Sequence, residues 1–523
     1  MKTTGNYRTG VERFVPSASE AVLLLAFVLF CWPMGFFDGK ALYGGNDNDA
    51  IAGLSTFAVV AIAWVLGVAL RAAMNDMRWW LVIAVAVAIV IPWLALNSFQ
   101  LGLMTQTAYF VILILGLNIV TGLTGQISLG HGALVGISAY TVAILMDHWG
   151  WPLFPAALVA ITLTTFVGFG LGIPALRLAG PYLAIATVAA AIIFPLVMKL
   201  DKFHDYTGTV QGLKISREER PHPPAFIGDF LESENISRIP ATKSFLVDQL
   251  NDPDTAPAAK ARAREQLDRE RQTYAQDVWI YFLTLVPAVI LIAAAWNLAR
   301  SRIGRAFIAV RDAEVAATSM GINVPLYKVV AFGISALYAG VTGALLYMVI
   351  AFVAPESFDL VNLSINPLAY LVIGGLASTG GPIIGAIGIK WVPEMTGLIA
   401  RQYKEFDLLQ GALVGVGLIV VMTRMPQGIW GTMVRLNGFS WVQLQAQISG
   451  WGRSRPGAFW AALAAGGLVV VIIGLVAGTI WAVFAAGALI VAPQDIWFGA
   501  YHAGRRLIPR GMRRDESGKA DAT

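Results

Sequence analysis

The chain has little charge and almost no cysteine or histidine. Only 13% of its 523 residues are charged, whereas 57% are hydrophobic, and it contains one cysteine and five histidines. A soluble domain averages about 25% charged residues, so this composition indicates a membrane protein. One cysteine excludes an intrachain disulfide, and so few thiols and imidazoles argue against a metal site. The net charge of +5 does not indicate nucleic-acid binding, because basic residues of membrane proteins collect in cytoplasmic loops.

The sequence also lacks the motifs of common enzyme classes. It has no G-x-x-x-x-G-K-[ST] loop for ATP, no H-E-x-x-H or C-x-x-C metal or redox motif, and no G-x-S-x-G nucleophile elbow. Ser128 and His131 lie three residues apart in an apolar stretch, but no third group is evident that would orient them. We therefore expect no catalytic residue, no cofactor bound by this chain and no enzymatic activity.

Long apolar runs dominate the sequence instead. A membrane-spanning helix needs about 20 mainly apolar residues, and the runs predict an all-α polytopic membrane protein with about 10–12 transmembrane helices. The candidate spans are 18–37, 50–70, 79–97, 104–121, 127–146, 154–176, 181–198, 278–298, 329–352 and 408–423. The first run resembles a signal peptide, but no small-x-small cleavage site follows it, so we interpret it as a retained signal anchor.

The charges of the loops predict the orientation of the spans. Residues 299–328 and 424–457 carry an excess of Arg and Lys and are placed in the cytoplasm, whereas 353–364 is acidic and placed outside. One net crossing is needed after 353–364, and the span 408–423 supplies it. Residues 366–390 should therefore enter and leave on the same side, as a re-entrant or broken segment around "GGLASTGGP". A kinked ordinary span is the alternative.

The apolar runs and the loop charges together divide the chain into three predicted regions. Residues 1–78 form an N-terminal two-helix extension, and 79–431 form the core, with an external insert at 199–277. Residues 432–523 form a C-terminal extension with an apolar hairpin at 458–493 and a basic tail. Both termini are expected in the cytoplasm, because the N-terminus and the tail are rich in basic residues.

Two polar segments interrupt the apolar pattern. "TGLTGQISLGHGALVGISAY" (121–140) places glycines and polar side chains in an apolar run, where both are unfavourable. "SRIGRAFIAVRDAEVAATSMGINVPLYK" (301–328) predicts a short amphipathic helix over 305–320 that ends at Gly321. A short helix held between two spans is a place where a soluble partner can act on a membrane protein.

Both segments resemble those of permease subunits of ATP-binding-cassette importers, and specifically the LivM-type permeases of the high-affinity branched-chain amino acid family. Four further stretches resemble motifs of that family in the same order: "AGPYLAIATVA", "TGTVQGL", "VIGGLASTGGPIIGA" and "RMPQGIWG". The resemblance covers roughly 100–431. It does not cover the first two spans, the long insert after "TGTVQGL" or the tail.

The resemblance implies a permease subunit in a bacterial inner membrane that moves branched-chain or related amino acids. It also implies its partners: a second homologous permease subunit, two cytoplasmic ATPases that hydrolyse ATP, and an external binding protein. A urea or short-amide permease of the same family is an alternative. An ion-coupled secondary transporter is a further alternative, but that class favours intramembrane carboxylates and inverted repeats, and neither is evident.

The resemblance also indicates two sets of functional residues. The expected substrate path is Gln126, Ser128, Gly130, His131, Gly132 and Tyr182. The expected ATPase-coupling loop is Arg305, Arg311, Asp312, Glu314, Ala316, Ala317 and Gly321. The polar groups of the path would bind a zwitterion, and its glycines would allow neighbours or substrate to approach closely. The alternative is that the glycines serve helix packing alone and that His131 is a satisfied interior residue.

Overall fold

The computed structural model describes most of the predicted core. The described residues are 88, 98–176, 181–209, 211–214, 220–224, 250, 256–402, 415, 419, 423, 425 and 427–437. Almost all of them belong to one compact unit, Gly35–Ala63 with Trp80–Thr432. The predicted first two spans, with the signal anchor, and the predicted C-terminal hairpin with its basic tail lie outside the described residues.

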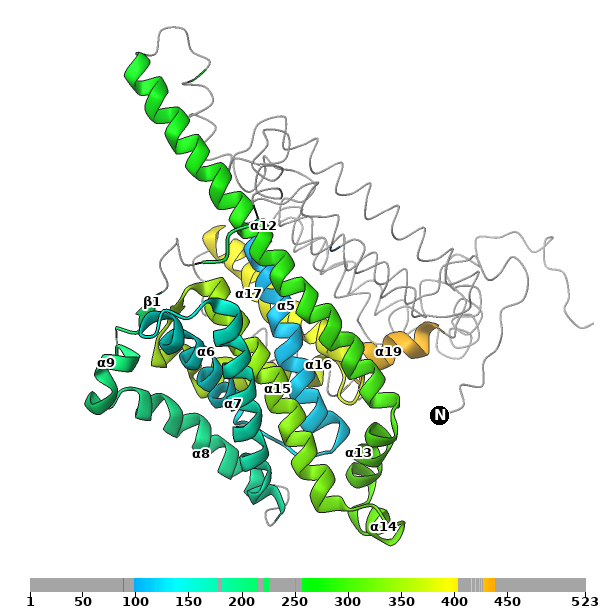
Figure 1. The fold of residues 1–523 in the computed structure, drawn as a ribbon. Helices are drawn as coiled ribbons and strands as arrows, with labels where there is room; N and C mark the ends of the chain where they lie inside the picture. Colours follow the sequence, from blue (N-terminus) through cyan, green and yellow to red (C-terminus); the bar gives the residue numbers. More distant parts are fainter. Residues whose placement is uncertain are drawn as a thin grey trace, which may run out of the picture. The chain divides into compact units, whose positions relative to one another are not determined.

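The described part of the chain is almost entirely helical (Figure 1). Its helices are α5 (Ser98–Leu117), α6 (His131–Asp147), α7 (Leu153–Gly172), α8 (Pro181–Met198), α9 (His204–Thr207), α12 (Pro257–Arg300), α13 (Arg302–Asp312), α14 (Glu314–Ser319), α15 (Val324–Ile350), α16 (Asn366–Gly374), α17 (Gly381–Gln402) and α19 (Gly428–Asn437). Within these residues five helices are long and apolar enough to cross a membrane, or six if one bent pair forms a single span. The predicted all-α polytopic membrane protein is confirmed.

Helix α15 lies at the centre of the unit and packs against α5, α6 and α7, while α5 also packs against α12 and α17 (Figure 1). The most apolar stretches of α5 and α15 are 78% and 72% buried inside the protein, whereas that of α7 is only 22% buried. Helices α7 and α8 instead expose large apolar side chains such as Phe166 and Ile185. An apolar helix is stable with such a face outward only where the surroundings are apolar as well, so this surface suits lipid or another membrane subunit.

Small residues allow the central helices to approach closely. A Cβ added to Gly343 of α15 would lie 2.3 Å from the Val135 carbonyl oxygen of α6. A Cβ added to Gly333 would lie 2.3 Å from the Phe169 ring of α7. Close contact of this kind is how helices associate in lipid, where there is no hydrophobic drive between them.

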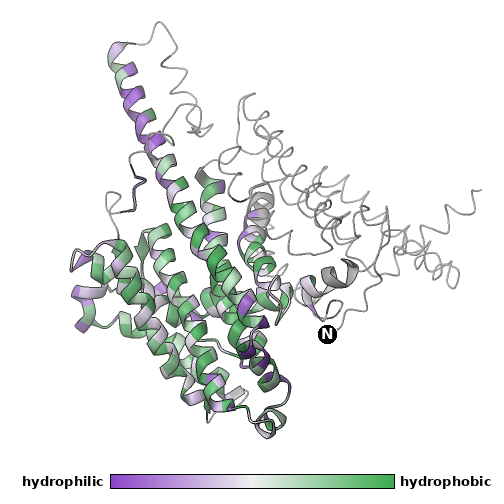
Figure 2. Ribbon diagram, turned by 45° about the vertical axis from the view of Figure 1, so that its right-hand side comes forward, coloured by the Kyte–Doolittle hydropathy of each residue, from purple (hydrophilic) through white to green (hydrophobic). Residues whose placement is uncertain are grey.

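Helix α12 is longer than a membrane crossing requires. Its 44 residues span about 66 Å, and a bilayer core is about 30 Å thick. Figure 2 shows that the end far from α13 is hydrophilic, whereas the part beside α5 is hydrophobic. The predicted span 278–298 is therefore the second half of a continuous helix, tied to α15 by the hydrogen bond from the Tyr338 hydroxyl to the Leu291 carbonyl oxygen.

The predicted break in 366–390 is confirmed. Helix α16 ends at Gly374, the turn 375–380 follows, and α17 runs back along α16. A Cβ added to Gly385 of α17 would lie 2.7 Å from the Tyr370 carbonyl oxygen of α16, so the two helices are in close antiparallel contact. The first limb, Pro355–Gly374, is long and apolar enough to span a membrane. The segment is therefore a helical hairpin and not a single kinked span, and the prediction that it enters and leaves on the same side of the membrane stays a prediction.

Two short strands lie at the end of the unit opposite α13. β1 (Leu213–Lys214) pairs antiparallel with β2 (Phe352–Val353), with Leu213 opposite Val353. The same end holds a contact between Lys199, at the end of α8, and Glu356, whose charged atoms are 2.7 Å apart. Both contacts join the predicted external insert to the loop predicted to lie outside.

Candidate functional site

The glycine-rich stretch 121–140 contains a break in the helix. Helix α5 ends in a π-helical turn, Asn118–Leu123, and α6 begins only at His131. Between them, Thr124–Gly130 is not helical, and we call these residues the unwound segment. The prediction that this span begins at residue 127 is therefore wrong. Gly125 has φ +72, and a Cβ there would lie 2.7 Å from Arg311 Cγ, so the break depends on a glycine that lies against a side chain from elsewhere in the fold.

Side chains from distant helices satisfy the backbone at the end of the unwound segment. The Leu129 amide donates to Thr187 Oγ1 of α8 at 3.0 Å, and the Gly132 amide donates to Ser364 Oγ at 3.0 Å. Ser364 lies in a second π-helical turn, Val361–Ile365, at the start of the hairpin. Non-helical backbone is tolerated at membrane depth only when protein groups satisfy it or when it lines a cavity. We call residues 129–132, with the side chains that bind them, the junction.

His131 links three helices at the junction. Its Nε2 lies 2.7 Å from Ser335 Oγ of α15, and the Ser335 hydroxyl donates to the Gly116 carbonyl oxygen of α5 at 2.6 Å. His131 is 1% exposed, and its other ring nitrogen, Nδ1, has no hydrogen-bond partner within the described part of the chain. The buried Gln126 likewise has an unpartnered Oε1.

Five of the six predicted path residues lie in the unwound segment or the junction. Gln126, Ser128, Gly130, His131 and Gly132 are all buried, whereas Tyr182 is 70% exposed on α8. The two glycines make close contacts with other helices. A Cβ at Gly130 would lie 3.2 Å from the Thr187 carbonyl oxygen, and a Cβ at Gly132 would lie 3.1 Å from Ser364 Oγ. Close packing is therefore one function of these glycines.

The predicted amphipathic helix 305–320 consists of two helices. α13 and α14 are separated at Ala313, where the backbone is extended, and we call Arg302–Ser319 the coupling segment. Ser301 caps α13, because its Oγ accepts a hydrogen bond from the Gly304 amide at 3.1 Å. The end at Gly321 is confirmed. Gly321 has φ +82, its amide donates to the Thr318 carbonyl oxygen, and the next amide, Ile322, donates to the Ala317 carbonyl oxygen, which is a Schellman motif.

The coupling segment has one buried face and one exposed face. Its buried residues include Ala306, Phe307, Val310 and Ala317. Ala316, Asp312 and Arg305 are exposed, and so is Gly321 just beyond the segment. Val315 and Met320 are each 83% exposed, which is unusual for apolar side chains beside so many charges. Of the seven predicted coupling residues, only Ala317 is buried, and the other six are exposed.

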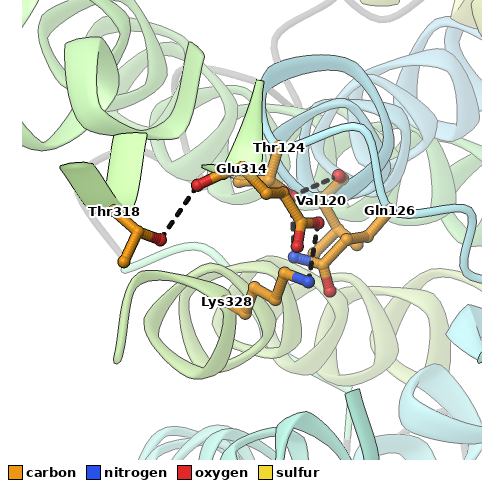
Figure 3. Close-up of polar contacts among 6 residues, drawn as sticks. All are labelled: Val120, Thr124, Gln126, Glu314, Thr318 and Lys328. Carbon is orange, nitrogen blue, oxygen red and sulfur yellow. Dashed lines mark hydrogen bonds and ion pairs between the residues drawn. The ribbon is translucent and has the colours of Figure 1, made fainter. Parts of the chain in front are cut away.

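Glu314 holds α14 against α15. Its carboxylate lies 2.7 Å from Lys328 Nζ, and Lys328 is buried (Figure 3). The Thr318 hydroxyl donates to the Glu314 carbonyl oxygen at 2.9 Å within the same short helix. A buried ammonium needs a partner, so the loss of this carboxylate would leave an uncompensated charge. Glu314 thus has an intramolecular role that its position in the loop does not reveal.

Arg311 joins the coupling segment to the end of α5. Its Nη1 donates to the Gly122 carbonyl oxygen at 3.0 Å, and its side chain also pairs with Asp312. Gly122 lies in the π-helical turn that also contains Asn118. Asn118 Nδ2 donates to the Ser378 carbonyl oxygen at 2.8 Å, and its Oδ1 accepts from the Ala377 amide at 2.9 Å. The coupling segment, the π-helical turn and the hairpin turn 375–380 are therefore in continuous hydrogen-bonded contact.

Several residues of the site were not identified from the sequence, and only three of them, Asn118, Thr187 and Ser335, are polar residues within a predicted span. In those three the polar side chain in an apolar run was the available signal, whereas Lys328 and Ser364 fall at the ends of predicted loops and had no such signal. In the described part of the chain, no group of three or more His, Cys, Asp or Glu side chains could hold a metal ion.

Residues 99–422 match the family described as "Branched-chain amino acid transport system / permease component". The chain belongs to this family. It is 30% identical over 325 residues to the high-affinity branched-chain amino acid transport system permease protein LivM of Salmonella typhimurium, which covers 62% of this chain and 68% of that relative. The LivM protein of Escherichia coli is similar to the same extent. The autoinducer 2 import system permease protein LsrC of Klebsiella pneumoniae is 27% identical over 146 residues, or 27% of this chain and 42% of LsrC. No solved structure matches the chain.

The family match covers the parts of the permease that carry the site. The unwound segment, the junction, the coupling segment and the hairpin all lie within 99–422, and the predicted N-terminal extension lies outside it. The protein is therefore a multi-pass membrane protein of a transport family, and the region that matches the family contains the helical unit built around α5 and α15.

Proposed function

We propose that the chain is one permease subunit of an ATP-binding-cassette importer in a bacterial inner membrane, and that it moves branched-chain or related amino acids. The observation that carries this proposal is the hydrogen bond from Arg311 to the Gly122 carbonyl oxygen. It connects the amphipathic helix pair between two described spans to the break in the expected substrate path. A permease driven by separate ATPases needs such a connection, because the nucleotide would be bound by the ATPases.

The open face of the coupling segment supports docking of a soluble partner. Val315 and Met320 are almost fully exposed, and Arg305 and Asp312 lie on the same short stretch. An apolar pair bordered by charges is the composition of a docking surface, whose core is apolar and whose rim is polar. Two cytoplasmic ATPases would bind this segment and its counterpart on a second, homologous permease subunit.

The connection gives the ATPases a route to the substrate path. ATP-driven closure of the ATPases would move α13 and α14, and Arg311 would transmit the movement to the π-helical turn. From there Asn118 reaches the hairpin turn, and the unwound segment continues to the junction. Such contiguous contacts allow a soluble event to shift the balance between outward-facing and inward-facing states. An external binding protein would deliver the amino acid at the opposite end of the unit.

Transport by a reconstituted complex tests the proposal. The permease pair, its ATPases and its binding protein would be placed in proteoliposomes, and uptake of radiolabelled leucine would be measured. We expect uptake only with ATP and binding protein. Uptake that is independent of ATP, or absent in the complete complex, would contradict the proposal.

The role of Arg311 is tested in the same system. Arg311→Ala should reduce uptake at least about tenfold while the ATPases still copurify, because the substitution breaks the link and leaves the docking face. Arg302→Ala is the matched control, since it removes the same charge from an exposed position at the start of α13. Equal uptake by the two variants would show that the link to Gly122 does not transmit the movement.

A further inference from the structure

One face of α6 packs against two other segments beyond the junction. Gly132, Gly136 and Tyr140 follow one another at intervals of four residues, so they share this face. We call the surface where it meets α8 and residues 355–365 the seam. A Cβ added to Gly136 would lie 2.2 Å from the Phe194 ring of α8, so the seam is tightly packed. It begins at the junction and runs along α6 towards the end of the unit that holds the predicted external insert.

Three aromatic rings fill the seam, and we call them the aromatic triad. Tyr140 comes from α6, Phe194 from α8 and Phe358 from the 3₁₀ turn Pro355–Phe358. The ring centroids are 6.0 Å apart for Tyr140 and Phe194, and 5.8 Å and 6.1 Å from those two to Phe358. Distances of this size are those of favourable aromatic pairs. Each ring contacts the other two and none is more than 9% exposed, so the aromatic triad closes the seam across all three segments.

The aromatic triad lies between the junction and the end predicted to be outside. Tyr140 is nine residues beyond His131, which is about 14 Å along α6, and the helix continues to Asp147. A solute that moves along the seam from the outside to the junction therefore has to pass the triad.

The Tyr140 hydroxyl is an unusual group to place there. It has no hydrogen-bond partner among the described residues, although Tyr140 is only 2% exposed. A buried hydroxyl without a partner has lost its hydrogen bonds to water and gained none in return. Phenylalanine would supply the same ring without that loss. The hydroxyl therefore makes the closed seam less stable than it could be, and it regains hydrogen bonds when the seam opens to water.

Two exposed polar contacts hold the same segments together beyond the triad. Lys199, at the end of α8, and Glu356, in the turn that carries Phe358, are 2.7 Å apart, with side chains that are 38% and 52% exposed. The His148 ring, directly after α6, contacts the Asp205 carbonyl oxygen of the insert. Exposed ion pairs contribute little stability, because water screens them. A protein that binds at this end can therefore replace these contacts with its own.

We propose that the aromatic triad is the external gate of the permease, and that substrate reaches the junction when α8 and the turn Pro355–Phe358 separate from α6. This inference rests on the proposed function. The binding protein releases the amino acid at the outer end of the seam, where the exposed contacts give way. Hydration of the Tyr140 hydroxyl then offsets part of the ring contacts that opening breaks.

Substitutions in the triad should move the gate in opposite directions. Tyr140→Phe keeps the ring and removes the unmet hydroxyl, so it favours the closed seam. Phe358→Ala removes one of the three rings, so it favours the open seam. Both leave the described hydrogen bonds of the junction in place.

Each variant has a matched control outside the seam. Tyr338→Phe also removes one tyrosine hydroxyl, but this hydroxyl donates to the Leu291 carbonyl oxygen, where α15 meets α12. Phe332→Ala also removes one buried ring, which belongs to α15 and packs against α7 near Gly172. The controls therefore report what a lost hydroxyl or a lost ring does to the fold in general.

The measurement is the rate at which a cysteine at the junction reacts with a small, charged methanethiosulfonate added outside intact spheroplasts. The charge keeps the reagent from crossing the lipid. Ser364→Cys supplies the reporter, because Ser364 is fully buried at the junction and cysteine is nearly the same size. Cys31→Ser removes the one natural cysteine, and a chain with that change alone gives the background. The complete importer, with ATPases and binding protein, is used throughout.

We expect Phe358→Ala to raise the labelling rate of the reporter at least about tenfold, because a lost buried ring weakens the closed state strongly. Tyr140→Phe should lower the rate about fivefold, since it removes the cost of one unmet hydroxyl from the closed state. Tyr338→Phe and Phe332→Ala should leave the rate close to that of the reporter chain.

Three results would overturn the inference. The first is an unchanged labelling rate in Phe358→Ala, which means that the triad does not close the route from outside. The second is a rate in Tyr140→Phe that equals or exceeds that of the reporter chain. The third is an equal rise in Phe332→Ala, which indicates general loosening of the fold. Labelling requires no transport, whereas absence of ATP-driven leucine uptake by the unsubstituted chain contradicts the proposed function, so the two failures are distinct.

Discussion

The two non-helical breaks of the permease satisfy their polar groups in different ways. In the hairpin turn 375–380, Asn118 binds both the Ala377 amide and the Ser378 carbonyl oxygen, and the Ser378 hydroxyl lies between Gly375 and Gly381. In the unwound segment the backbone is tied at Leu129, but Gln126 retains an unpartnered atom, as does His131 just beyond it. The polar groups of the hairpin turn are thus satisfied by Asn118 and Ser378, whereas Gln126 and His131 each keep one atom without a partner among the described residues.

The two breaks are nevertheless joined. Asn118 reaches the hairpin turn and Gly122 accepts from Arg311, and both belong to the π-helical turn that precedes the unwound segment. π-helical turns are rare and are frequently found at functional sites. The π-helical turn therefore connects the coupling segment to the hairpin turn and directly precedes the unwound segment.

The largest expected effect comes from breaking the hairpin turn. Asn118→Leu fills the space but leaves the Ala377 amide and the Ser378 carbonyl oxygen without their partner, and because both are partly buried each costs at most about 1–3 kcal/mol. We expect a marked fall in the thermal unfolding midpoint of the detergent-purified protein and loss of uptake. Asn323→Ala is the control, because it removes only an exposed helix cap worth about 1 kcal/mol. Similar unfolding midpoints for the two variants would show that the turn is not held by Asn118.

A smaller effect on the fold, with a complete effect on transport, is expected at the junction. Gly132→Leu places a branched side chain where a Cβ alone would lie 3.3 Å from Leu363 Cβ. We expect uptake of leucine to be abolished while the variant still assembles with the ATPases. Gly102→Leu on α5 is the control, since a Cβ there meets nothing within 4 Å. Normal uptake by the Gly132 variant would mean that the junction lies neither on the path nor at a tight contact.

The smallest of the three effects concerns the coupling segment. Glu314→Lys replaces an ion pair with two ammonium groups, one of which, Lys328, is buried. We expect reduced uptake and weaker association with the ATPases, because α14 would be displaced. The double variant Glu314→Lys with Lys328→Glu restores opposite charges and should recover much of the loss. Failure of the double variant to recover would indicate that Glu314 contacts the ATPase directly.

The local sequence predicted those features that depend on neighbouring residues. Gly321 ends the coupling segment because a left-handed position follows the last turn, and the hairpin break falls at the Gly-rich "GGLASTGGP". The apolar run 127–146, in contrast, predicted a helix through residues that are unwound. Periodicity could not reveal the break, since glycine and small polar residues are also common in packed transmembrane helices.

The partners of the site could not be predicted in this way. Thr187 is 58 residues from Leu129, Ser335 is 204 residues from His131, and Ser378 is 260 residues from Asn118. Each is one hydroxyl, amide or carbonyl group in a long apolar context, and nothing local indicates which other group it meets. Arg311 and Glu314 were recognised as important, but their intramolecular bonds depend on how α13 and α14 pack on α5 and α15.

The sequence by itself determined that this chain is an all-α membrane protein with an amphipathic coupling segment and a hairpin broken at its glycines, because hydropathy, glycine content and loop charge act locally. The tertiary structure decided which polar atoms are satisfied and which remain free. Helix α15 packs between α5 and α6, and this places the Ser335 hydroxyl where it donates to the Gly116 carbonyl oxygen and accepts from His131 Nε2. That arrangement leaves Nδ1 as an acceptor, since the protonation of a buried imidazole follows from its partners and not from its place in the sequence.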